Sequence, residues 1–305
     1  GVCKPENVWV VTNKKYAALV HEQLPEIPEG NILQEPCRRN TAPCVAYISW
    51  RIKEKDARAN IVVTPSDHIV NNCNEFRRVI TSALKFTGET DSIVTLGMKP
   101  TRPETGYGYI QGDLSTPSAR NREIFRVDQF KEKPDLATAE KYVKDHNFFW
   151  NAGIFIMSAA TIVNAFRVYQ PGIAKIFESM RSIYGTEKEQ EQIDLRYPEC
   201  ENISIDYAIM EKAEEIFVFP ADFGWSDLGT WGSLLAQSKK DANGNATIGN
   251  NIQMIDSKNN IVHTLNEKKV VIQGLEGYII AEENGTLLIC KMSEEQNIKF
   301  FSGMN

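Results

Sequence analysis

The first hundred residues alternate between short apolar runs and longer segments in which apolar residues recur every three or four positions. Runs typical of buried strands occupy residues 8–11, 32–35, 61–64 and 93–96. Segments with helical periodicity occupy residues 14–24, 41–55 and 75–86. Strands that alternate with helices predict an α/β fold, in which a mostly parallel central sheet is covered on both faces. We expect Thr41 to cap the helix at 41–55, with Pro43 in its first turn.

The pattern changes after Pro100, where strands and helices no longer alternate regularly. Strands are predicted at residues 107–111, 125–130, 151–157 and 216–219. Helical segments are predicted at residues 136–144, 159–182, 187–196 and 206–214. We expect residues 1–240 to form one domain built on the central sheet.

From about residue 243 the chain consists of short apolar runs separated by Asn and Gly. These runs occupy residues 252–255, 261–264, 270–272, 278–281 and 287–289. The dipeptides at 259–260, 276–277 and 284–285 favour tight turns. Residues 241–305 therefore predict a small all-β unit, with a boundary near residues 238–246.

Composition excludes several classes of protein. The chain has 305 residues, of which 42% are hydrophobic and 24% charged, as in ordinary globular proteins. Its net charge is −6 without a long basic run, so the electrostatic signature of nucleic-acid binding is missing. No apolar stretch reaches the length of a membrane span. The six cysteines are scattered without a CxxC pair, which favours reduced thiols in a cytoplasm.

Two aspartates are candidate metal ligands. The run at 65–68, which contains Ser66 and Asp67, follows a predicted buried strand. Ligands in open α/β sheets bind at the carboxyl ends of strands, and carboxylate oxygens suit hard divalent cations. Asp227 lies between glycines and could meet Asp67 across a cleft. A turn or cap role explains Asp67 equally well, and pattern alone favours Asp227 as the cap of a helix near Leu228.

Further polar groups could read a sugar phosphate. Gly108 lies among aromatic residues and would let the backbone approach a ligand closely, although an edge-strand bulge is an alternative. Glu132 and Lys133 offer an acceptor for hydroxyls and a cation for a phosphate, although such pairs are common on surfaces. Asn151 could read hydroxyls or simply mark a bend.

The segment at 38–41, with Arg39 and Asn40, precedes a predicted helix N-terminus. The helix dipole and two arginines would attract an anion or nucleotide, while plain capping by Thr41 is equally compatible. No Ser-His-Asp or Cys-His arrangement is supported by its context, so covalent nucleophilic catalysis is not expected.

Seven short runs occur in a fixed order along the chain. They are EPCRRNTAP at 35–43, TPSDHIV at 64–70, RPETGYGYI at 102–110, FKEKP at 130–134, WNAGIF at 150–155, SIDYAIMEK at 204–212 and GWSDLGTW at 224–231. Together they resemble bacterial mannose-1-phosphate guanylyltransferases over roughly residues 8–290. The resemblance implies a Rossmann-like nucleotide-diphospho-sugar transferase fold, a C-terminal β unit often used in dimer contacts, and a homodimer. It also implies a Mg²⁺-dependent enzyme that makes GDP-mannose and pyrophosphate from GTP and mannose 1-phosphate.

The same resemblance implies roles for residues that match the family's motifs. Asp67 and Asp227 would be the metal ligands and act in catalysis with Lys133. The residues implied in substrate binding are Glu35, Arg39, Asn40 and Thr41 at the guanosine side, Ser66, and Gly108, Glu132, Lys133 and Asn151 around mannose 1-phosphate.

One departure from the family pattern concerns phosphate binding. The family has a Gly-rich loop of the form GGxGxRLxP…PK on its first strand–loop–helix, and this sequence lacks it. That strand would be central, so its two neighbours would be left about 10 Å apart with unpaired edges. We hypothesise an upstream segment of some tens of residues, which the intact mass of the natural protein would test.

Three other functions remain open at this point. A related nucleotidyltransferase could use another base or sugar. A regulatory homologue could bind sugar nucleotides without turning them over, as a missing phosphate loop would favour. A purely structural β-rich protein is disfavoured, because the polar motifs gather at strand ends.

Overall fold

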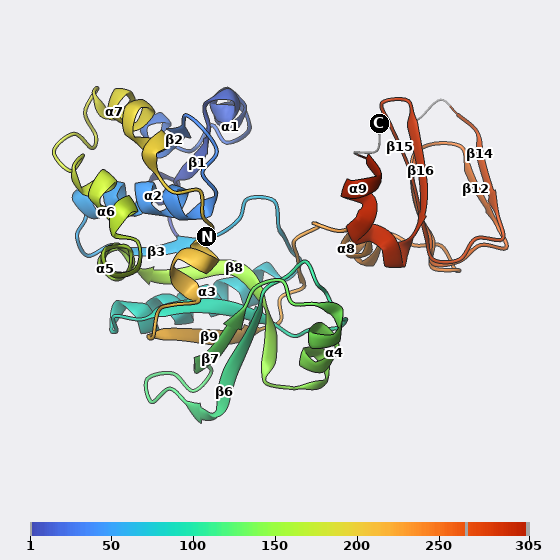
Figure 1. Cartoon of the computed structure of the whole chain (residues 1–305), viewed down its shortest axis with the longest axis horizontal. Helices are drawn as coiled ribbons and strands as arrows, with labels where there is room; N and C mark the ends of the chain where they lie inside the picture. Colours follow the sequence, from blue (N-terminus) through green and yellow to red (C-terminus); the bar gives the residue numbers. More distant parts are fainter. Residues whose placement is uncertain (1, 266–267, 303–305) are drawn as a thin grey trace. The chain divides into compact units, whose positions relative to one another are not determined.

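A computed structural model describes residues 2–265 and 268–302, which form two compact units (Figure 1). The first unit combines the residues through Pro65 with Asn72–Phe223. The second unit combines Ser66–Asn71 with the residues from Gly224 onward. Each unit has its own sheets and its own buried core.

Within the described residues, the main sheet of the first unit has six strands in the order β3–β8–β5–β9–β7–β6. Their bounds are β3 Asn60–Val63, β5 Ile93–Met98, β6 Tyr109–Pro117, β7 Phe125–Lys131, β8 Phe148–Ser158 and β9 Ile216–Ala221. Strands β5 and β9 pair in parallel, while β8 and β7 run antiparallel to their neighbours. Strands β3, β5, β9 and β6 therefore point one way in a mixed sheet, which confirms the expected α/β class.

Two further strands of the first unit form a separate parallel pair. Strand β1 spans Val10–Asn13 and β2 spans Ile32–Glu35. Among the described residues, β1 pairs only with β2 and β3 only with β8. Strands β1 and β3 thus each present an edge without a ladder partner among the described residues.

The helices of the first unit cover the sheets. They are α1 Ala17–Gln23, α2 Thr41–Lys55, α3 Cys73–Gly88, α4 Leu136–Lys144, α5 Ala159–Tyr169, α6 Pro171–Glu178 and α7 Glu189–Arg196. Short 3₁₀ segments are η1 Pro5–Asn7, η2 Lys14–Tyr16, η3 Glu29–Asn31 and η4 Tyr197–Glu199, and η5, Asp206–Met210, is a π-helix. Helix α3 shows why such segments form: Asn72 accepts a hydrogen bond from the Glu75 N–H, and one face of the helix is buried.

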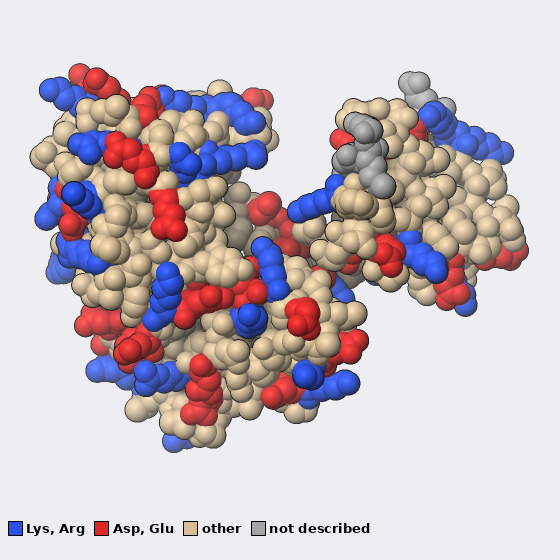
Figure 2. All heavy atoms as spheres, in the orientation of Figure 1, with Lys and Arg blue, Asp and Glu red and all other residues tan. Residues whose placement is uncertain are grey.

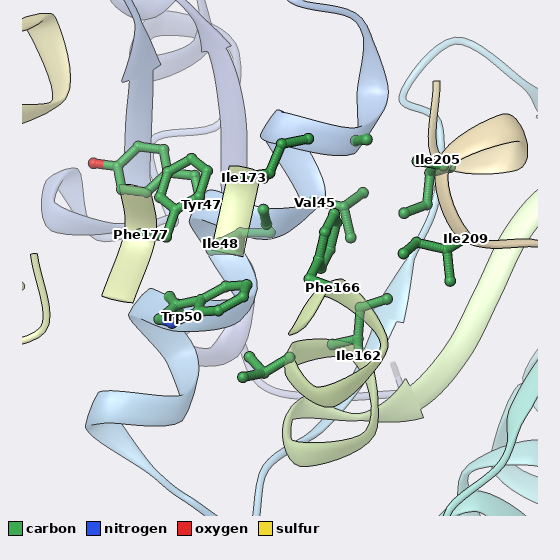
Figure 3. Close-up of a cluster of buried hydrophobic side chains, with 14 of the residues drawn as sticks. Val45, Tyr47, Ile48, Trp50, Ile162, Phe166, Ile173, Phe177, Ile205 and Ile209 are labelled. Atoms are coloured by element: carbon green, nitrogen blue, oxygen red, sulfur yellow. The ribbon is translucent and has the colours of Figure 1, made fainter. Parts of the chain in front are cut away.

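The largest buried cluster lies where α2, α5 and α6 meet (Figure 3). Tyr47 and Trp50 project from α2 toward Phe166 of α5 and Phe177 of α6. Tyr47 stacks on Phe177 with ring centroids 6.1 Å apart, and Trp50 lies 5.9 Å from Phe166. Each large side chain buried in this way contributes roughly 1.5–3 kcal/mol by removal of apolar surface from water.

Three local predictions were wrong. The helix expected at 159–182 is interrupted at Gln170, because Pro171 lacks the N–H needed to continue α5 and instead starts α6. The cap of α2 is Asn40 instead of Thr41: Asn40 has φ 64° and its side chain accepts the Thr41 N–H. The helix expected at 206–214 is a π-helix that ends at Met210.

The second unit is mainly β, as the sequence predicts for residues 241–305, but it begins at Gly224 and also includes Ser66–Asn71. Its elements are β4 Ile69–Val70, β10 Trp225–Ser226, α8 Trp231–Gln237, β11 Ala246–Ile248, β12 Ile252–Ile255, β13 Ile261–His263, β14 Val270–Gln273, β15 Tyr278–Glu283, β16 Thr286–Lys291, η6 Met292–Asn297 and α9 Ile298–Ser302. Strands β11, β13 and β15 pair in parallel within one sheet, and β12 and β14 pair in parallel within another. The buried amide of Asn245 links neighbouring coils by accepting hydrogen bonds from the N–H and amide of Asn260. Only the last turn, at Asn284 and Gly285, forms a hairpin within the described residues of these sheets.

In the described part of the chain, no helix is both long and apolar enough to cross a bilayer. Basic and acidic side chains are interspersed over the face visible in Figure 2. This mixture agrees with the absence of a long basic run in the sequence.

Candidate functional site

Two sequence-distant aspartates are brought together in the second unit. Strands β4 and β10 pair antiparallel, with Ile69 opposite Ser226. If this register is continued by one residue, Asp227 comes opposite His68, and Asp67 directly precedes His68 in the chain. The Asp67 side chain is 84% exposed, whereas Asp227 Oδ1 accepts the Gly229 N–H at 2.9 Å. Ser66 lies exposed beside Asp67.

His68 lies between the two carboxylates and a tryptophan. Its Nδ1 accepts the indole N–H of Trp225 at 3.1 Å, and its Nε2 lies 3.9 Å from Asp67 Oδ1. Burial lowers the pKa of His68, and the negative charges of Asp67 and Asp227 partly offset that effect. Because Nδ1 is an acceptor here, the neutral ring has its proton on Nε2, on the side of Asp67.

The aspartate pair has the chemistry of an open cation site. Magnesium prefers oxygen ligands and commonly binds one or two carboxylates together with water and substrate phosphates. In the described residues, no group of three or more Asp, Glu, His or Cys side chains is arranged to enclose an ion. Neither aspartate caps a helix, since Asn72 caps α3 and Thr230 caps α8. The pair therefore fits an ion that is shared with a ligand better than a closed structural site.

A second group of candidate residues gathers in the first unit, around Gly108, which directly precedes β6. A Cβ atom on Gly108 would lie 2.4 Å from Glu132 Oε2 and 3.3 Å from Asn151 Cβ. The Asn151 N–H donates to the Gly108 carbonyl at 2.8 Å. Lys133 Nζ lies 3.4 Å from Glu132 Oε1. The structure thus brings together the four residues predicted to hold a sugar phosphate.

The charges of this group are unequally exposed. The Glu132 side chain is 11% exposed and that of Lys133 is 61% exposed. Burial raises the pKa of Glu132, and the nearby Asp206 charge raises it further, while Lys133 lowers it. Burial also raises the pKa of Asp206. Buried acceptors beside an exposed cation are suited to a ligand with hydroxyls at one end and a phosphate at the other.

Two residues in this group were not identified from the sequence. The Thr95 hydroxyl donates to Asn151 Oδ1 at 3.1 Å, and Asn151 Nδ2 donates to Asp206 Oδ1 at 3.0 Å. Asp206 lies in the run at 204–212 that contributed to the family resemblance, but that run was given no role. Asp206 is the first residue of a π-helix, and π-helical turns are found frequently at functional sites.

The residues predicted at the guanosine side lie between β2 and α2 of the first unit. The Tyr197 hydroxyl donates to the Glu35 carboxylate, and burial raises the pKa of Glu35 while that hydrogen bond lowers it. Cys44 also hydrogen-bonds to Glu35. The Glu35 carboxylate is therefore half-buried and anchored.

The other three residues of this group also have partners. An Arg39 guanidinium N–H donates to the Pro198 carbonyl, and its Nε is buried without a partner among the described residues. The Asn40 side chain is occupied as the cap of α2. The Thr41 hydroxyl accepts the Ile205 N–H at 2.8 Å. Together these bonds tie the start of α2 to the segment that follows Tyr197.

Comparison with known proteins shows the family. A family model described as Nucleotidyl transferase matches residues 3–244. The chain therefore belongs to the nucleotidyl transferase family.

The individual proteins that the chain resembles have more specific names than the family model. The chain is 34% identical over 295 residues to the mannose-1-phosphate guanylyltransferase of Escherichia coli, covering 95% of this chain and 63% of the relative. It is 34% identical over 293 residues to the xanthan biosynthesis protein XanB of Xanthomonas campestris pv. campestris (strain B100), covering 95% and 61%. The crystal structure of mannose-1-phosphate geranyltransferase from Thermus thermophilus superposes with a TM-score of 0.82 at 27% identity, covering 98% of this chain and 84% of that one. The chain thus spans about three fifths of the length of the curated relatives it matches.

Proposed function

We propose that this chain carries out nucleotidyl transfer to a sugar phosphate, making GDP-mannose and pyrophosphate from GTP and mannose 1-phosphate. The pairing of β4 with β10 carries the proposal, because Asp67 lies two residues before β4 and Asp227 directly follows β10, at the same end of this antiparallel pair. The names of the curated relatives support the choice of guanosine and mannose.

Asp67 and Asp227 are the residues that would hold Mg²⁺. A Mg²⁺ ion bound there would supply positive charge to the phosphate oxygens of the substrates. The Gly229 N–H restrains Asp227 by hydrogen bonding to Oδ1. His68, which accepts a hydrogen bond from Trp225, directs its Nε2 toward Asp67 at 3.9 Å.

Mannose 1-phosphate is assigned to the group around Gly108. Glu132 would accept hydrogen bonds from sugar hydroxyls. Because Gly108 has no Cβ, the Glu132 carboxylate can lie against its backbone without a clash. Asn151 would contribute its amide, and Lys133 would meet the phosphate with its exposed ammonium. Glu35, Arg39, Asn40 and Thr41 are assigned to the guanosine side, and Ser66 to substrate contact.

The proposed transfer needs no general base. A phosphate oxygen of mannose 1-phosphate, already an anion, forms a bond to the α-phosphorus of GTP. The bond between that phosphorus and the oxygen bridging to the β-phosphate breaks, and pyrophosphate leaves with the electron pair. The protein's part is to orient the two phosphates and neutralise their charge, with Lys133 supplying a cation on the sugar-phosphate side.

In this proposal residues 1–240 carry the transfer chemistry, and residues 241–305 form a β unit that pairs two copies of the chain. Strand β16 ends the sheet β11–β13–β15–β16, and Leu287 and Ile289 on it are 57% and 54% exposed. Such an edge is a suitable surface for a homodimer contact. We also assign the reaction to the cytoplasm, which the scattered cysteines support.

A pyrophosphate-release assay tests the function. The chain is incubated with GTP, ATP, UTP or CTP and with mannose 1-phosphate or glucose 1-phosphate, with and without Mg²⁺. The proposal predicts the fastest release with GTP, mannose 1-phosphate and Mg²⁺. Faster release with another pair would correct the substrate assignment, and GDP-mannose binding without any release would indicate a regulatory homologue.

A further inference from the structure

The side-chain amide of Asn151 has three hydrogen-bond partners inside the first unit. Its Oδ1 accepts from the Thr95 hydroxyl at 3.1 Å and from the Gly153 N–H at 3.0 Å. Its Nδ2 donates to Asp206 Oδ1 at 3.0 Å. The second N–H of this amide has no acceptor among the residues that the structure describes. Three of the four hydrogen-bonding positions of Asn151 are therefore already used.

These partners allow the amide one orientation. A backbone N–H can only donate, so Gly153 must face the amide oxygen. A carboxylate can only accept, so Asp206 must face the amide nitrogen. Turning the amide by half a rotation would set donor against donor and acceptor against acceptor. The hydrogen-bond pattern thus decides the assignment of oxygen and nitrogen, which atomic positions alone often leave open.

The remaining N–H adds an uncharged donor to the surrounding group. Glu132 contributes a largely buried carboxylate, which accepts hydrogen bonds, and Lys133 contributes an exposed cation, which donates them. Asn151 Cβ and the Glu132 carboxylate both lie close to Gly108. A sugar hydroxyl can then donate to Glu132 while a neighbouring sugar oxygen accepts from Asn151. This combination of acceptor and donor is suited to the vicinal hydroxyls of a hexose.

We propose that Thr95 and Asp206 are positioning residues, which hold the Asn151 amide so that its second N–H donates to an oxygen of a bound hexose 1-phosphate. The inference deepens the proposed function and rests on it. Asn151 acts only as a donor to the ligand, because its oxygen is saturated by Thr95 and Gly153. Thr95 and Asp206 act through Asn151 and need not touch the ligand.

An exchange of side chains separates this role from a merely structural one. In the double variant Asn151→Asp/Asp206→Asn, donor and acceptor exchange sides without a change in net charge. Every internal hydrogen bond can form again, but position 151 no longer holds an N–H for the ligand. A structural role predicts that the exchange restores both stability and binding, whereas a positioning role predicts that it restores stability alone.

The experiment measures thermal unfolding and the dissociation constants of mannose 1-phosphate and inorganic phosphate by calorimetry. Asp206→Asn should lower the unfolding midpoint and weaken mannose 1-phosphate binding about tenfold, the scale of one lost hydrogen bond, with phosphate binding unchanged. The double variant should regain the midpoint but keep the weakened binding. Thr95→Val should weaken binding while Thr95→Ser, which keeps the hydroxyl, should not. Asp128→Asn on the exposed face of β7 is the matched control.

The outcomes separate the two levels of the proposal. A double variant that binds mannose 1-phosphate as tightly as the unchanged chain overturns the positioning role and leaves the proposed function intact. A double variant that regains neither stability nor binding also contradicts it, because the exchange should rebuild the internal bonds. An unchanged chain that binds phosphate but no mannose 1-phosphate contradicts the proposed function, and the inference with it.

Discussion

The hydroxyl of Tyr197 donates a hydrogen bond to the carboxylate of Glu35, which lies 162 positions earlier in the chain. Tyr197 is fully buried, and Glu35 ends strand β2. The contact joins the end of β2 to η4, and a bond from Arg39 to the Pro198 carbonyl strengthens the same junction. The loop before α2 is thus fixed by a segment that the linear sequence places far away.

The Glu35 contact makes a specific prediction about pH. Burial raises the pKa of Glu35, so above the ordinary value of about 4.3 the unfolded chain loses this proton while the folded chain keeps it. Stability contributed by Glu35 is complete below that value and falls as pH rises through the raised pKa. Glu35→Gln cannot ionise, so its stability relative to the unchanged chain should improve with pH in this window.

Urea unfolding of Glu35→Gln and of the unchanged chain from pH 4 to pH 7 measures the difference in their free energies of unfolding. The comparison isolates Glu35, because other groups with raised pKa values contribute equally to both chains. Glu22→Gln, on an exposed position of α1, is the control and should track the unchanged chain. A stability difference between Glu35→Gln and the unchanged chain that stays constant over this range would refute the prediction.

Gly108→Ala tests the space reserved for Glu132. The added Cβ would lie 2.4 Å from Glu132 Oε2, so the carboxylate must move. Because the displaced atom ends a flexible side chain, we expect a stability loss below about 1 kcal/mol but at least a tenfold weaker affinity for mannose 1-phosphate. Calorimetry and thermal unfolding measure the two effects. Gly172→Ala, where a Cβ meets nothing within 4 Å, should leave the affinity unchanged.

Trp50→Ala tests the cluster between α2, α5 and α6. Trp50 is 1% exposed and packs against Phe166 and Phe177. Its removal should cost about 3–5 kcal/mol of unfolding free energy through lost burial and the cavity left behind. Val168→Ala, on the exposed face of α5, should cost less than about 0.5 kcal/mol. Equal losses in urea unfolding of the two variants would show that this cluster is not the core.

Trp50→Phe sharpens the same test. Trp50 Nε1 is buried and has no hydrogen-bond partner among the described residues. Phenylalanine keeps most of the apolar contact and removes this unpaired donor, so the loss should be much smaller than for Trp50→Ala.

Much of the fold could be predicted because its signals are local. The helix at Thr41–Lys55 and the strand at Ile32–Glu35 have the predicted bounds, since periodicity and flanking breakers define them. The break at Pro171 was also encoded locally, but the apolar periodicity on both sides concealed it. The cap of α2 required a residue with positive φ, which Asn40 tolerates better than Thr41.

The candidate site was less predictable, because its interactions join distant segments. Asp67 and Asp227 were identified by their context beside a strand and between glycines, yet only strand pairing brings them together. Asp206 and Thr95 gave no separate signal: each is an ordinary residue of a predicted helix or strand. Their connection through Asn151 depends on tertiary contacts over 55 and 56 positions.

The most direct test of the central claim is the binding of Mn²⁺, a paramagnetic substitute for Mg²⁺, followed by electron paramagnetic resonance. If Asp67 and Asp227 share a cation, each of Asp67→Asn and Asp227→Asn should weaken binding at least tenfold, on the scale of a lost charged ligand. The double variant should bind Mn²⁺ more weakly than either single variant. Its fold-loss of affinity should be smaller than the product of the two single fold-losses, because both carboxylates bind the same ion. Asp256→Asn, an exposed aspartate of the same unit, should bind like the unchanged chain. Unchanged Mn²⁺ affinity in both single variants would contradict the account.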